Sequence, residues 1–211
     1  MKHAILPLLL LVPTLLLAGA PAGTYTEDFE KMAEGKPAES ILVLSGEFAV
    51  KKEGGNAFIE LAADPLDTQG FMAGPDAFVT GTVSARIQAA STGKRFPEFG
   101  VGAGGPAGYK LTLMPAAKQL MVVKNEQVLA KAPCDWQSGA WTRFKLTITK
   151  LDGGKAKIEG KAWADGKDEP AAAQVAYEAA EMPNAGRPTF WSTPYSGQAT
   201  RFDDLSAAVT K

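Results

Sequence analysis

The strongest constraint on the fold is a period of two between apolar and polar residues over three long segments. Residues 78–88 alternate in this way throughout, as expected of a strand with one buried face. Residues 141–150 and 155–163 repeat the pattern, and Asp152–Gly154 between them suits a hairpin turn. These segments predict antiparallel strands.

Shorter segments extend the same pattern along the chain. Connections rich in Gly and Pro separate them at a spacing of roughly ten residues, without a linker of low complexity or a repeat of fixed period. This arrangement predicts an all-β fold, an antiparallel β-sandwich that forms one domain over residues 23–211. The shorter predicted strands are 48–52, 58–62, 99–103, 109–114, 120–124, 127–130, 188–192 and 201–209.

Residues 171–182 leave two alternatives open. Their Ala-rich sequence has high helix propensity and would allow three helical turns. The other interpretation is a short strand at 174–178, with Val175 and Tyr177 facing the core. We favour the strand because the surrounding topology is antiparallel, and tertiary context often overrides propensity.

The first 22 residues have the layout of a secretory signal peptide. A short basic start is followed by an apolar stretch and then by small residues, with cleavage expected after Ala22. A retained membrane anchor is the alternative, but Pro7 and Pro13 interrupt the apolar stretch. The segment predicts a secreted or periplasmic protein without membrane insertion after cleavage. Cleavage would also remove His3, the only histidine of the chain.

Charge and cysteine content exclude several classes of function. The full chain has a formal net charge of −1 and no run of five or six like charges. It therefore lacks the basic surface that nucleic acids require, and no nucleic-acid partner is expected. Cys134 is the only cysteine, so no intrachain disulfide forms. Without a histidine in the processed chain, a Cys134 nucleophile would have no imidazole base.

Two motifs suggest ligands and metals. Residues 100–105 match G-x-G-x-x-G, but Pro106 and another strand follow where a dinucleotide site needs a helix, so the segment indicates a β-turn. No cofactor is expected, although oxygen ligands leave a structural calcium ion as one candidate. Asp203 shares the strand period of Leu205, and a carboxylate directed at the core needs a cation or donors. Calcium ligands would be Asp28, Asp203 and Asp204, while Arg201, Arg187 or backbone N–H groups are the alternative partners.

Aromatic residues near strand ends and turns indicate sugar binding, because aromatic rings stack on the apolar face of a pyranose. The alternative for each tryptophan is a packing role within the sandwich or under a loop. Glycoside cleavage requires two carboxylates at a controlled separation. No strand presents two acids on one face. The candidate carbohydrate-binding residues are Arg95, Glu98, Tyr109, Trp163, Trp191 and Tyr195.

Seven segments carry a resemblance to known proteins, namely 95–101, 108–109, 139–146, 158–163, 168–170, 186–188 and 202–205. They resemble secreted bacterial domains of the concanavalin A-like lectin/glucanase superfamily, particularly the laminin-G-like and 3-keto-disaccharide hydrolase-like domains. The resemblance covers most of residues 24–209 and implies a two-sheet antiparallel jelly-roll β-sandwich with adjacent first and last strands, and a link to carbohydrates. The Glu-x-Asp-x-x-Glu motif of the superfamily's glucanases is absent.

The sequence is compatible with three functions. The first is a non-catalytic carbohydrate-binding module with a polysaccharide or glycan partner. The second is a glycoside or 3-keto-glycoside hydrolase with an unidentified carboxylate pair, for which Glu98 and Asp168 are candidates. The third is a structural protein of the cell envelope with a protein partner. The lack of the glucanase motif and of histidine favours the first.

Overall fold

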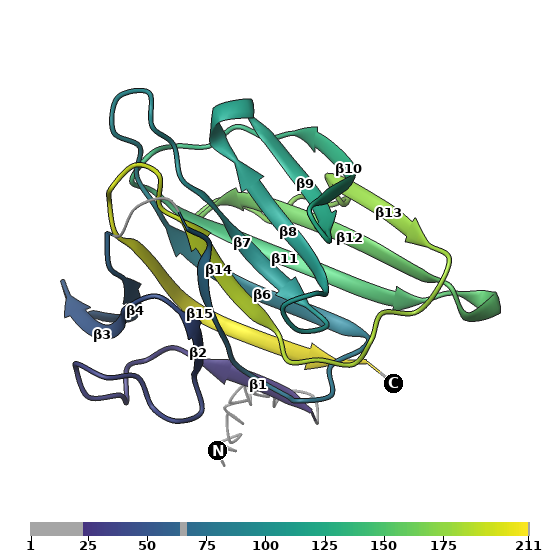
Figure 1. Cartoon of the computed structure of the whole chain (residues 1–211), viewed down its shortest axis with the longest axis horizontal. Coiled ribbons are helices and arrows are strands. Elements are labelled where there is room, and N and C mark those ends of the chain that lie inside the picture. The colour runs from purple at the N-terminus through teal and green to yellow at the C-terminus, as the bar shows by residue number, and fades with distance from the viewer. Residues whose placement is uncertain (1–22, 64–66, 211) are drawn as a thin grey trace, which may run out of the picture.

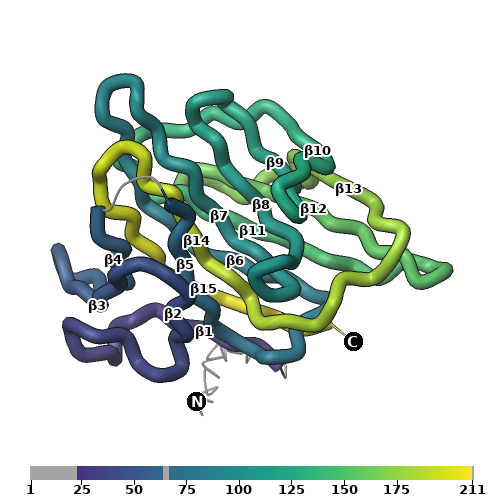
Figure 2. Tube along the Cα trace, in the orientation of Figure 1, coloured from purple at the N-terminus to yellow at the C-terminus, as the bar shows by residue number. Residues whose placement is uncertain are grey.

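The computed structural model describes residues 23–63 and 67–210, which form two antiparallel β-sheets packed face to face (Figure 1). The predicted signal peptide at 1–22 lies outside the described residues. Figure 2 shows how the segment after β13 crosses from one sheet to the other before β14. The observed architecture confirms the predicted all-β sandwich.

Sheet A contains the first and last described strands, which pair with each other. Thr24 of β1 lies opposite Ala208 of β15, as the resemblance implied. Most of the sheet has the order β13-β12-β11-β6-β15-β4-β3, and β1 joins it beside β15. The strands are β1 (Thr24–Glu27), β3 (Phe48–Glu53), β4 (Asn56–Leu61), β6 (Gly81–Gln88), β11 (Trp141–Lys150), β12 (Ala156–Ala164), β13 (Val175–Ala179) and β15 (Thr200–Val209).

Sheet B has the order β10-β9-β8-β7-β14-β5-β2. Its strands are β2 (Leu42–Ser45), β5 (Gln69–Met72), β7 (Glu98–Ala103), β8 (Tyr109–Met114), β9 (Gln119–Lys124), β10 (Gln127–Pro133) and β14 (Thr189–Thr193). The sequence pattern did not predict β2 and β5, because β2 is exposed at every position and β5 has only four residues. Short 3₁₀ turns occupy Pro115–Ala117 and Asp152–Gly154.

The ambiguous segment 171–182 contains a strand, which confirms the favoured alternative. In β13, Ala179 pairs with Ala156 of β12, and the side chains of Val175 and Ala179 are buried. Just before the strand, the Gln174 side-chain carbonyl accepts a hydrogen bond from the Ala162 N–H at 2.6 Å. Pairing along an open sheet edge and burial of two apolar residues therefore override the helix propensity.

The core consists of the inward side chains of both sheets. On β11, Phe144, Leu146 and Ile148 are buried and alternate with outward polar residues. The sheets come close where Gly160 of β12 faces β8, because a Cβ at Gly160 would lie 2.2 Å from Leu111 Cδ1. Each sheet thus keeps a second, outer face on which functional side chains can lie.

The Asp203 side chain lies on the outer face of sheet A, so its predicted orientation toward the core is wrong. Asp203 pairs with Arg86 of β6, whereas the next paired residue of β15, Ser206, lies opposite Ser84. One extra residue is therefore inserted in β15, and Asp204 adopts a positive φ of 49°. Such a β-bulge resets the alternation, so that Leu205 returns to the core.

Arg86 is the partner of Asp203, in place of the predicted Arg201 or Arg187. The Asp203 carboxylate is 1% exposed and lies 2.5 Å from Arg86 Nη2. It also accepts hydrogen bonds from Asn56 at 2.9 Å and from the Asp204 N–H at 2.6 Å. Burial raises the pKa of Asp203, and these three partners oppose that effect. Arg201 and Arg187 instead bind Glu60 and Asp76, respectively.

Arg86→Met is expected to lower the free energy of unfolding by about 3–5 kcal/mol, because it leaves the buried Asp203 charge unpaired. Adding Asp203→Asn should restore much of the loss, since the amide carries no charge. Urea unfolding measures both variants. Arg187→Met, which breaks the pair with exposed Asp76, is the control and should cost less than about 1 kcal/mol. An equal loss of unfolding free energy in Arg86→Met and Arg187→Met would contradict this prediction.

Candidate functional site

The candidate site lies on the outer face of sheet B, where three neighbouring strands present polar and aromatic side chains. On β14, the Phe190 side chain enters the core and Trp191 lies on the outer side. On β8, Leu111 and Leu113 enter the core. On β7, Phe99 enters the core and Glu98 lies on the outer side. The period of two therefore assembles Trp191, Lys110, Thr112 and Glu98 on one surface.

Glycines on both neighbouring strands leave space around Trp191. Gly100 of β7 and Gly70 of β5 are its direct partners across the sheet, and Gly100 in turn pairs with Thr112. A Cβ at Gly70 would lie 2.7 Å from the Phe190 carbonyl oxygen, so this position requires glycine. Gly100 belongs to the glycine-rich run 100–105, whose motif indicated a turn. Its first part lies in β7, which confirms the strand predicted at 99–103.

Two adjoining cavities form on this surface, and we call them together the tryptophan groove. The larger has a volume of about 410 Å³ and the smaller about 170 Å³. They share Thr68, Pro106, Lys110 and Trp191. Besides these four, the larger is lined by Glu98, Ala107, Gly108, Thr112, Met114, Met121, Val123, Lys124, Asn125, Glu126 and Val128, and the smaller by Leu44, Ser45, Gln69, Gly70, Thr189 and Phe190.

Several polar groups of the groove have no hydrogen-bond partner among the described residues. The Trp191 indole N–H and the Thr189 hydroxyl are unpaired, although these residues are only 7% and 3% exposed. The Glu98 carboxylate accepts no hydrogen bond within the described part of the chain. Lys110 Nζ lies over the Trp191 ring, 5.3 Å from its centroid. Buried polar groups normally find partners, so such a set indicates a ligand site.

Burial shifts the pKa values of two charged groups of the groove, Glu98 and Lys110, in opposite directions. It raises the pKa of the half-buried Glu98 carboxyl above its usual range. It lowers the pKa of the Lys110 ammonium, and the nearby Glu126 opposes that shift. Both shifts favour the neutral form of the group, since charge is costly where water is partly excluded. Perturbed groups of this kind cluster at functional sites.

Glu98→Gln is expected to raise the Tm at about pH 7, because it removes a carboxylate whose charge is disfavoured by burial. With its pKa raised in the folded protein, Glu98 contributes most to stability below its unfolded-state pKa. That contribution is lost as the pH rises through the folded-state pKa. The variant and the wild type should therefore converge at about pH 3. Thermal unfolding followed by circular dichroism measures the difference in Tm between the variant and the wild type. A Tm difference that does not change with pH would contradict the prediction.

The other predicted sugar-binding residues lie outside the groove. Trp163 lies on the outer face of sheet A, paired with Arg143 of β11. Arg95 is exposed in the turn before β7, and Tyr195 is 40% exposed in the loop after β14. Tyr109 lines a separate cavity at the edge of the sandwich. The structure therefore unites only Glu98 and Trp191.

Sequence reasoning missed Lys110, Thr112 and Thr189 as groove residues. The alternation along β8 and β14 indicated that these side chains share the outer face of their strands. The sequence did not indicate that β7 lies between the two strands and brings them together. On β7 itself, the positions two and four residues after Glu98 are Gly100 and Gly102. This strand therefore presents one carboxylate and no second acid on the same face.

The predicted calcium ligands divide between two places. Asp28 and Asp204 line one cavity of about 490 Å³, together with Glu27. Asp203 is instead engaged by Arg86, and Asp204 lies 3.1 Å from Arg143 Nη2. Within residues 23–63 and 67–210, no group of three or more acidic, His or Cys residues could hold a metal ion. Calcium binding stays a prediction that these contacts do not favour.

Ion pairs occupy the central outer face of sheet A. Asp165 lies 2.5 Å from Arg143 Nε and 3.4 Å from Arg86 Nη1. Burial opposes ionisation of Asp165, but the hydrogen bonds and charges of these two arginines outweigh it and lower the pKa. Arg86 also lies over the Trp141 ring, 4.8 Å from its centroid. These groups stabilise one another and leave few of their donors and acceptors for a ligand.

No family model matches the sequence, and no curated protein matches it. Solved structures do match. Crh5 transglycosylase in complex with NAG has a TM-score of 0.59 at 11% identity, over 92% of this chain and 86% of that chain. The carbohydrate binding module CBM66 from Bacillus subtilis has a TM-score of 0.53 at 12% identity, over 80% of this chain and 96% of that chain. Alginate lyase Aly36B in complex with an alginate tetrasaccharide has a TM-score of 0.54 at 7% identity, over 90% of this chain and 98% of that chain.

At these identities the likeness shows the fold alone. The chain has the concanavalin A-like lectin/glucanase fold, which confirms the predicted fold class. The similar structures named above include a binding module as well as enzymes. Among the described residues, no helix is long and apolar enough to cross a membrane.

Proposed function

We propose that this protein is a secreted, non-catalytic carbohydrate-binding module that holds a glycan in the tryptophan groove. The observation that carries the proposal is the set of unpartnered polar groups around Trp191. Secretion rests on the predicted signal peptide at 1–22. The binding function is also supported by the names of the similar structures, which include a carbohydrate binding module.

The chemistry of the groove matches that of a sugar. A pyranose has apolar C–H faces and a rim of hydroxyls that both donate and accept hydrogen bonds. Trp191 and the apolar side chains of Met114 and Met121 supply contact area. Glu98 can accept hydrogen bonds, and Lys110 can donate them. Two acids, Glu98 and Glu126, are balanced by two lysines that line the same cavity, which favours an uncharged ligand.

Trp191→Ala is expected to weaken polysaccharide binding at least about tenfold, since the ring and its N–H act at the centre of the groove. Affinity gel electrophoresis against neutral and acidic polysaccharides, followed by titration calorimetry, measures the loss. Trp163→Ala on the opposite sheet is the matched control and should bind like the wild type. Trp191→Phe, which keeps a ring, should have intermediate affinity.

Two results would count against this proposal. The first is a wild-type protein whose mobility no polysaccharide in a broad panel changes. The second is equal loss of binding in the Trp191 and Trp163 variants, which would indicate a site elsewhere. Circular dichroism of each variant establishes that the fold is intact.

A glycosidase is the second candidate, and one specific observation favours it. The raised pKa of Glu98 is what a general acid requires, and Glu126 lines the same cavity as a second carboxylate. This candidate predicts release of reducing sugar from a bound polysaccharide and its loss in Glu98→Gln. Glu159→Gln on sheet A is the control. A polysaccharide that binds without any release would exclude this alternative for that substrate.

A further inference from the structure

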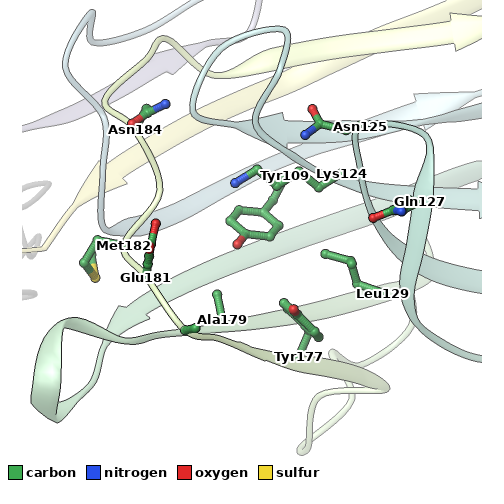
Figure 3. Close-up of a pocket in the computed structure, with 11 residues that line it drawn as sticks. Tyr109, Lys124, Asn125, Gln127, Leu129, Tyr177, Ala179, Glu181, Met182 and Asn184 are labelled. Carbon is green, nitrogen blue, oxygen red and sulfur yellow. The ribbon is translucent and has the colours of Figure 1, made fainter.

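A separate cavity lies at the open edge of the sandwich, between the edge strands β10 and β13 (Figure 3). We call it the edge cavity. Its volume of about 350 Å³ is within the range of about 300–1,000 Å³ that small-molecule sites occupy. It is lined by Tyr109, Lys124, Asn125, Gln127, Leu129, Tyr177, Ala179, Ala180, Glu181, Met182 and Asn184.

Two tyrosines give the edge cavity an aromatic wall. The ring centroids of Tyr109 and Tyr177 lie 6.4 Å apart, and the rings are tilted by 44°. Figure 3 shows the Tyr109 ring in the middle of the labelled residues, with its hydroxyl directed toward the strand that carries Ala179. Lys124 Nζ lies 4.6 Å from the Tyr109 ring centroid. Such a surface suits the apolar face of a sugar, with polar groups at its rim.

The polar groups of this wall and rim are not used within the protein. Tyr109 is only 4% exposed, yet its hydroxyl has no hydrogen-bond partner among the described residues. The side chains of Gln127, Glu181 and Asn184 likewise make no hydrogen bond within residues 23–63 and 67–210. The amides and the carboxylate are therefore available to bind vicinal hydroxyls, which both donate and accept.

The β9–β10 turn separates the edge cavity from the tryptophan groove. Lys124 and Asn125 line both cavities, Glu126 lines the groove, and Gln127 lines the edge cavity. Asn125 and Glu126 have positive φ values of 49° and 63°, as in the tight turns of hairpins. The two cavities are therefore neighbours on either side of one short turn.

We infer that the edge cavity is a second sugar subsite, and that one neutral oligosaccharide spans the groove and the edge cavity across the β9–β10 turn. This inference rests on the proposed function. Across the two cavities the acids Glu98, Glu126 and Glu181 slightly outnumber Lys110 and Lys124. A polyanionic glycan would find no excess of positive charge, so the ligand is uncharged.

Titration calorimetry with disaccharides and hexasaccharides of the laminari-, cello- and xylo- series tests the inference. The wild type should bind its preferred hexasaccharide about tenfold more tightly than the disaccharide, because a second subsite adds contacts. Tyr177→Ala should abolish this gain in affinity from disaccharide to hexasaccharide and leave the disaccharide affinity unchanged. Gln127→Ala, at an exposed position, should reduce the gain without disturbing packing. Tyr195→Ala, an exposed tyrosine elsewhere, is the matched control.

The outcomes separate this inference from the proposed function. If Trp191→Ala loses binding while Tyr177→Ala and Gln127→Ala keep the full gain with chain length, the edge cavity is not a subsite and the groove function stands. If alginate oligosaccharides bind and the neutral series does not, the neutral ligand class is wrong. If neither binds, both proposals fail.

Discussion

Two sheets pack through their apolar inner faces, and every other property of this structure depends on that contact. The inner faces are filled by Phe, Leu, Ile and Val side chains from both sheets, such as Phe144 and Leu111. Because strand side chains alternate, burying one face fixes which residues lie on the other. Polar and aromatic side chains for binding are therefore restricted to the outer faces and to the edges of the sandwich.

The two outer faces differ in how their polar groups are satisfied. On sheet A, Arg86 and Arg143 bind Asp165, Asp203 and Asp204, so each of these charged groups has a partner within the protein. On sheet B, the Glu98 carboxylate and the Trp191 N–H have no partner among the described residues. Unpaired polar groups in a partly buried site carry an energetic cost that a hydrogen-bonding ligand can offset. This contrast distinguishes the groove from an ordinary sheet surface.

The sequence predicted the strands well where the alternation was long, as in β11 and β12. It did not predict the four-residue strand β2, which is exposed throughout and carries no periodic signal. It also placed Asp203 on the wrong face, because an alternating pattern does not predict the β-bulge that inserts one extra residue at Asp204. Of the six predicted sugar-binding residues, Glu98 and Trp191 share a cavity, and Tyr109 lines another. Residue type identified these candidates, but strand order decided which of them meet.

The sequence by itself determined the all-β class, the inward and outward faces of the long strands, and the absence of an intrachain disulfide and of histidine beyond residue 3. These properties are local, since they follow from residue types and from a period along one strand. Only the tertiary structure decided that β14, β7 and β8 are neighbours, so that Trp191, Gly100 and Thr112 form one row across sheet B. It also decided that Trp163 lies on the opposite face from Trp191. The pairing of β14 with β7 joins strands far apart in the sequence, and no local pattern encodes it.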